Sequence, residues 1–133
     1  MPIELSKYLS KLDRAEYEVD GAKVTCWFGP RRSGRRQLVR VREVDDGIRM
    51  EATIATARTL DSIRMHDDPS RWAWRRNKVR HIVGFRVDGQ KRLTAEAVAP
   101  SAGLTQEEFE IYLRSVAAEA DRMELVLTGQ DLE

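Results

Sequence analysis

Short turn motifs containing Asp and Gly divide much of the chain into segments in which apolar and polar residues alternate. These motifs are Asp20-Gly21, Asp45-Asp46-Gly47 and Asp88-Gly89-Gln90. Glycine readily takes the positive φ that tight hairpin turns require, and an alternating segment has one apolar and one polar face. The pattern therefore predicts antiparallel strands joined by short turns, in a sheet with one solvated face.

Helical spacing marks the two ends of the chain. Apolar residues that fall on one helix face predict a first helix over residues 5–12. Near the other end, Thr105-Gln106-Glu107-Glu108 forms a capping box, in which the Thr hydroxyl and the Glu carboxylate satisfy two backbone N–H groups. A stripe at helical spacing follows and predicts a final helix of about four turns. Its members are Phe109, Tyr112, Leu113, Val116, Ala117, Ala120 and Met123.

The remaining segments complete the predicted order of elements. Alternation predicts strands over residues 17–19, 24–28, 38–42, 48–54, 82–87 and 93–98. Residues 56–68 have no clear period and predict a connection with room for one helical turn, and Asp68-Pro69 is a typical start for a helix reaching about Asn77. This order predicts an α+β fold, an antiparallel sheet backed by helices in the order α-β(3–4)-α-β-β-α. The length of 133 residues predicts a single domain over 1–133.

Composition excludes several classes of protein. Hydrophobic residues make up 41% of the chain, enough for a folded core, whereas no apolar run approaches the ~20 residues of a membrane span. We therefore expect a soluble, cytoplasmic protein that does not enter a membrane. The single Cys26 and the two histidines, His66 and His81, argue against a structural zinc site, an iron–sulfur centre or a disulfide framework.

No motif in the chain predicts catalysis. Residues 29–36 copy the glycine spacing of a phosphate-binding P-loop, but two arginines replace its Lys and Ser/Thr, and a strand follows in place of a helix. Residues 66–68 predict a surface loop better than a metal site, because adjacent residues rarely converge on one ion. Cys26 alternates with Val24 and Phe28, which predicts a buried small hydrophobe. We expect no catalytic residue, no metal and no cofactor.

The net charge of +1 hides an uneven distribution. Residues 1–92 hold 21 Lys/Arg and 13 Asp/Glu, whereas residues 93–133 hold 2 and 9. A basic body and an acidic final segment can pair within the molecule or with a second copy. Clustered arginines near tryptophans can also bind phosphates and stack on bases. The candidate nucleic-acid-binding residues are Arg31, Arg32, Arg35 and Arg36, with pairing to the acidic last helix as the preferred interpretation.

Two tryptophans in the predicted middle helix are candidates for protein binding. Trp72 and Trp74 are two positions apart, so on a helix their side chains point about 200° from each other. One of them fits in the core, and the other is left as a rim residue or an interface anchor. Tryptophan is enriched at interface hot spots because it buries a large area at little entropic cost.

The second half of the chain resembles the YbjN-like proteins, which share the fold of type III secretion chaperones. The resemblance covers residues 69–129: a short helix ending near Asn77, the segment V-G-F-R-V-D-G-Q-K-R-L-T-A-E-A-V-A-P, the capped helix beginning L-T-Q-E-E-F, and a final L-T-G. It implies a small protein-binding or chaperone-like module, often dimeric, with no established cofactor.

These observations favour a non-catalytic protein-interaction module with a chaperone-like or scaffolding role. Its expected partners are a second copy of itself, in a homodimer, and an unidentified protein client. The alternative is a nucleic-acid-binding accessory protein that uses the Arg-rich hairpin tip.

Overall fold

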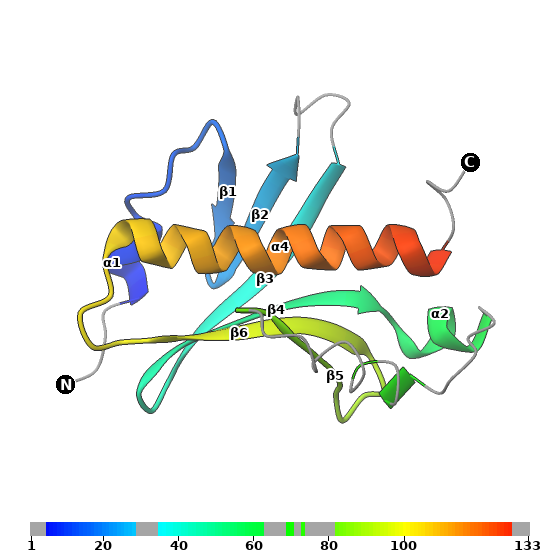
Figure 1. The fold of residues 1–133 in the computed structure, drawn as a ribbon. Helices are drawn as coiled ribbons and strands as arrows, with labels where there is room; N and C mark the ends of the chain where they lie inside the picture. Colours follow the sequence, from blue (N-terminus) through cyan, green and yellow to red (C-terminus); the bar gives the residue numbers. More distant parts are fainter. Residues whose placement is uncertain (1–4, 29–34, 63–68, 71–72, 74–81, 129–133) are drawn as a thin grey trace.

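A computed structural model describes residues 5–28, 35–62, 69–70, 73 and 82–128 of the chain (Figure 1). Its helices are α1 (Leu5–Leu9), α2 (Ala57–Ser62) and α4 (Gln106–Thr128). Its strands are β1 (Tyr17–Asp20), β2 (Lys23–Phe28), β3 (Arg35–Val44), β4 (Gly47–Ala55), β5 (Gly84–Val87) and β6 (Leu93–Pro100).

The six strands form one antiparallel sheet in the order β1-β2-β3-β4-β6-β5. The first four follow chain order as a meander, and the β5–β6 hairpin joins through its second strand. The longest ladder pairs β4 with β6, from Gly47 opposite Pro100 to Ala55 opposite Leu93. The predicted α+β class, with helices backing an antiparallel sheet, is confirmed.

Each Asp-Gly motif lies at a turn between two consecutive strands. Gly21 has a φ of +61° in the β1–β2 turn. In the β5–β6 turn, the Asp88 carboxylate accepts backbone N–H bonds from Gln90 and Arg92, both at 2.9 Å. Gly47 is needed for a different reason, because a Cβ there would lie 2.2 Å from the backbone oxygen of Ala99 on β6. That close approach explains a glycine at the start of β4.

The predicted capping box begins the long helix. The Thr105 hydroxyl accepts the Glu108 N–H at 3.1 Å, and the Glu108 carboxylate accepts the Thr105 N–H at 3.0 Å. From this cap, α4 runs for 23 residues along the length of the molecule and packs across β3, β4 and β6 (Figure 1). At ~1.5 Å per residue the helix spans roughly 35 Å, so one helix covers the middle of the sheet.

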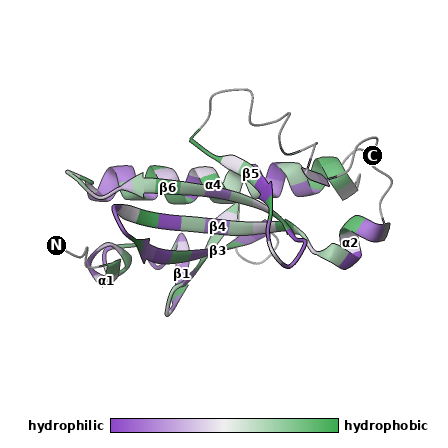
Figure 2. Ribbon diagram, turned by 90° about the horizontal axis from the view of Figure 1, so that it is seen from below, coloured by the Kyte–Doolittle hydropathy of each residue, from purple (hydrophilic) through white to green (hydrophobic). Residues whose placement is uncertain are grey.

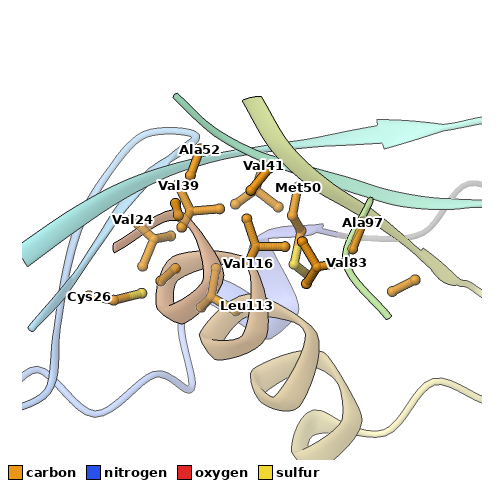
Figure 3. Packing of buried hydrophobic residues seen from close by; sticks show 14 of the residues in the cluster. Val24, Cys26, Val39, Val41, Met50, Ala52, Val83, Ala97, Leu113 and Val116 are labelled. Carbon is orange, nitrogen blue, oxygen red and sulfur yellow. The ribbon is translucent and has the colours of Figure 1, made fainter. Parts of the chain in front are cut away.

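The hydrophobic core lies between α4 and one face of the sheet. Alternate residues of β2, β3, β4 and β6 point toward Leu113 and Val116 of the helix (Figure 3). The first helix closes one end of this layer, where the Tyr8 ring stacks on Phe109 with centroids 4.9 Å apart. The Tyr8 hydroxyl donates to the Leu104 carbonyl at 2.9 Å, so α1 is tied to the loop before α4.

Several predicted boundaries are displaced. The first helix ends at Leu9 and not at residue 12, although Leu12 is buried after a turn. β6 runs to Pro100, where proline is tolerated because the β5 ladder ends at Glu96 and the strand is paired only with β4. β3 begins at Arg35, which corrects the prediction of a polar tip over residues 29–36. Arg35 and Arg36 pair with Phe28 and Trp27 in the β2–β3 ladder.

Within the ranges that the structure describes, no helix is both long enough and apolar enough to span a membrane.

Candidate functional site

Only two of the six candidate binding residues can be placed. Trp72, Trp74, Arg31 and Arg32 lie outside the described residues. Ala73, between the two tryptophans, is buried and belongs to the hydrophobic core. The predicted placement of one tryptophan in the core and the other at the surface stays a prediction.

The two described arginines of the predicted nucleic-acid-binding set already have contacts within the molecule. Arg35 forms an ion pair with Asp121 of α4, with 3.5 Å between nitrogen and oxygen. The Arg36 guanidinium lies over the ring of Trp27, 5.4 Å from its centroid. At Arg35 the basic segment therefore meets the acidic last helix, as the preferred interpretation of the charge distribution expected.

The sheet face opposite the core carries a connected group of charged side chains, and we term it the polar face. Its side chains come from alternate positions of four adjacent strands. The ribbon in Figure 2 shows hydrophilic and hydrophobic residues alternating along these strands. Its members are Leu38, Arg40 and Arg42 of β3, Arg49, Glu51 and Thr53 of β4, Thr94, Glu96 and Val98 of β6, and Arg86 of β5.

Residues of like charge stand directly opposite each other on the polar face. Glu51 pairs with Glu96 across the β4–β6 ladder, and Arg42 pairs with Arg49 across the β3–β4 ladder. Like charges in register destabilise a sheet unless other groups compensate. The compensation comes from arginines on neighbouring positions, and Arg40 itself stands directly opposite Glu51.

Arg49 contacts both glutamates, Glu96 diagonally on β6 and Glu51 two residues along its own strand. Its Nη2 donates to Glu96 at 2.5 Å, and its Nε donates to Glu51 at 3.2 Å. Arg86 bridges the same two carboxylates, with Nη2 at 3.5 Å from Glu51 and Nε in contact with Glu96. Arg42 approaches Glu51 from the other side at 3.9 Å. Two glutamates are thus shared among three arginines in a connected network.

The members of the network differ in how far their side chains are exposed to solvent. The Glu51 and Glu96 side chains are only 16% and 17% exposed, whereas Arg42 is largely exposed. Arg40 donates to the Thr53 hydroxyl at 3.1 Å and adds a further positive charge. The carboxylates therefore lie inside, and the outer layer of this surface is positive.

Two apolar side chains flank the charged network. Leu38 is 45% exposed and lies next to Arg40 on its strand face, and Val98 is 46% exposed and stands opposite Arg49. Arginine combined with exposed apolar groups is typical of protein interfaces, where aspartate, glutamate and lysine are depleted.

Cys26 is a described side chain that could act as a nucleophile if its thiol were accessible and ionised. Burial, opposed by the nearby charge of Arg114, raises the pKa of the Cys26 thiol to about 12, so the sulfur is a neutral core group. The prediction that Cys26 is a buried small hydrophobe is confirmed. Among the described residues, no three His, Cys, Asp or Glu side chains are arranged to hold a metal ion. His66 and His81 lie outside the described residues.

No family model, curated protein or solved structure matches this chain. The resemblance to YbjN-like proteins therefore stays a prediction.

Sequence reasoning foresaw part of the polar face and missed its centre. The shared strand face of Arg40 and Arg42 follows from alternation alone. The pairing of Glu51 with Glu96 does not, because it depends on β6 lying beside β4. The available signal was an acidic residue on the polar face of each of two strands: Glu51 has Arg49 two residues before it on β4, whereas β6 offers Glu96 no basic residue.

Proposed function

We propose that the protein is a non-catalytic protein-interaction module that forms a homodimer through the polar face and has a chaperone-like or scaffolding role toward a protein client. One observation carries this proposal: an Arg–Glu network with a positive outer layer, flanked by exposed Leu38 and Val98, on a sheet face opposite the only long helix among the described residues. The resemblance to YbjN-like proteins supports the same class.

The charge layout supports contact with a second copy. Arg40 and Arg42 give β3 a row of positive charge on the polar face, whereas Glu18 and Asp20 are exposed and acidic on β1, two strands away across β2. A two-fold axis brings the same patch of each protomer against its partner, so a surface that carries both signs can complement itself. Burying Leu38 and Val98 in that contact supplies the hydrophobic part of the binding energy.

Light scattering on a size-exclusion column tests the dimer. At micromolar concentrations we expect a mass about twice 15.3 kDa. Leu38→Glu and Val98→Glu should each shift the mass toward the monomer with little change in the thermal midpoint. Ile111→Glu is the matched control, because Ile111 is 53% exposed on the outer side of α4. A monomer at all concentrations, or dissociation by the control alone, would contradict the polar-face interface.

The nucleic-acid alternative has its own test. The ion pair between Arg35 and Asp121 does not favour it, since that arginine already has a protein partner. Binding of random-sequence DNA should weaken with salt by a log–log slope of about −0.9 per phosphate neutralised. We expect no binding near physiological salt. Tight binding that is abolished by replacing Arg31, Arg32, Arg35 and Arg36 with Ser would replace the protein-interaction proposal.

A further inference from the structure

A cavity of about 280 Å³ lies at the edge of the sheet, between the β1–β2 hairpin and α4. Three sequence segments build it: the start of β1, the end of β2, and two positions one turn apart on α4. Its lining residues are Glu16, Tyr17, Cys26, Trp27, Phe28, Arg114 and Ala118. None of the polar-face residues Leu38, Arg49 or Val98 takes part, so this cavity is separate from the proposed interface.

Apart from Glu16 and Arg114, the residues that line the cavity are uncharged and mostly apolar. Burial raises the pKa of the Tyr17 phenol as well as that of the Cys26 thiol, so both groups stay neutral at physiological pH. Phe28 supplies a further large apolar side chain next to Cys26. Besides Arg114, the helix contributes the small residue Ala118, which leaves space that a larger side chain would occupy.

Arg114 brings a fixed positive charge to the rim of this apolar wall. Its Nε donates to the Tyr17 hydroxyl at 2.6 Å, and its Nη2 donates to the Glu16 carboxylate at 2.6 Å. These two contacts orient the guanidinium and do not use Nη1. Both Arg114 and Glu16 are exposed, and an ion pair in that setting is held weakly against solvent.

We propose that this cavity binds a small monocarboxylate with an apolar, aromatic-sized body. The carboxylate takes the place of Glu16 on Arg114, and the body packs against Cys26, Phe28 and Ala118. The volume fits this class, because a dry cavity of ~150 Å³ holds a benzene ring and this cavity is nearly twice that size. A bidentate contact to a planar guanidinium is the geometry that carboxylates favour.

Calorimetric titration with 3-phenylpropanoate tests the proposal, with 3-phenylpropan-1-ol and acetate as matched controls. We expect the carboxylate to bind at least tenfold more tightly than the alcohol, and acetate not to bind. Amide chemical shifts should move at the β1 start, the β2 end and residues 114–118. Equal affinity for carboxylate and alcohol, or shifts elsewhere, would overturn the assignment.

Variants separate the roles of the lining residues. Arg114→Gln should weaken 3-phenylpropanoate binding at least tenfold, and Ala118→Leu should abolish it by filling the space. Glu16→Gln should strengthen binding several-fold because it removes the competing carboxylate, a sign that a merely structural pair would not give. Arg122→Gln, an exposed position two turns along α4, should leave the affinity unchanged. Weaker binding of 3-phenylpropanoate by the Glu16→Gln variant would contradict the proposal that the ligand carboxylate replaces Glu16 on Arg114.

The carboxylate can come from a free molecule or from the C-terminus of a peptide. Titration with N-acetylphenylalanine and with a hexapeptide ending in Phe distinguishes these sources. Tighter binding of the hexapeptide assigns the site to a chain terminus, and equal binding assigns it to a free acid. Each circular dichroism melt must match that of the wild type. The oligomeric state is read in the same samples, so a failure here leaves the polar-face dimer untouched.

Discussion

The two faces of the sheet are built from the same strands and are held by different forces. Met50, fully buried, points into the core between the sheet and α4, and its neighbour Glu51 points the other way and is itself only slightly exposed. The core face depends on apolar volume excluded from water. The polar face depends on where each charge finds its partner, because Glu51 and Glu96 stand opposite each other and need Arg49 and Arg86 between them.

The two faces therefore respond differently to substitution. A core contact is lost when shape or polarity changes, whatever the surroundings. A contact in the Arg–Glu network loses its value when a single partner is removed, and it weakens as salt screens the charges. The following variants test this contrast.

The largest effect is expected on the core face. Leu113→Asp places a carboxylate at a fully buried position of α4, and an unpaired buried charge with a lost apolar side chain should cost more than about 4 kcal/mol. We expect loss of cooperative unfolding and of the helical circular dichroism signal. Ile111→Asp, on the exposed side of the same helix, should cost no more than ~0.5 kcal/mol. Equal loss at both positions would mean that the α4 stripe is wrongly assigned.

An intermediate effect is expected on the polar face. Arg49→Gln leaves Glu51 and Glu96 opposite each other with one arginine fewer, and should lower the free energy of unfolding by about 1–3 kcal/mol in urea titrations. Arg42→Gln removes an exposed arginine at 3.9 Å and should cost about 0–1 kcal/mol. The difference in the free energy of unfolding between the two variants should become smaller at 1 M salt. Equal, salt-independent losses would show that the network does not hold this face.

The smallest effect comes from Glu124 on α4. Burial, followed by the nearby charge of Asp121, raises its pKa, against a hydrogen bond from Gln37 at 3.5 Å. Stability from this group is therefore complete below the pKa of the unfolded chain and is lost as the pH rises through the folded pKa. Glu124→Gln should raise the thermal midpoint slightly at pH 7 and leave it unchanged near pH 3.5. A stabilisation that is larger at acidic pH would contradict this sign.

Features that depend on neighbours in the sequence were predictable. The Asp-Gly motifs mark turns as expected, although among their glycines only Gly21 takes the positive φ, which Lys91 takes in the β5–β6 turn. The capping box forms as expected, because its hydrogen bonds join Thr105 and Glu108, three positions apart. The helical stripe from Phe109 to Met123 is buried as predicted, with Tyr112 only partly buried, since periodicity alone places those residues on one face. The strand alternation likewise separated the core face from the polar face.

Features that join distant parts of the chain were not predictable. The extension of β3 to Arg35 depends on pairing with Phe28, and the ion pair of Arg35 depends on Asp121 lying 86 positions further along the chain. The cavity beside Arg114 exists only because the start of β1, the end of β2 and the middle of α4 meet at one edge.

Local sequence patterns were enough to predict the class of fold, the positions of its main turns and the polarity of each strand face. These features follow from backbone preferences and from the periods of helix and strand. Only the tertiary packing places β6 beside β4. This placement sets Glu51 against Glu96 and makes Arg49 and Arg86 the residues that hold the polar face together. The strength of a charge depends on its distance from other charges in space, and no local pattern contains that distance.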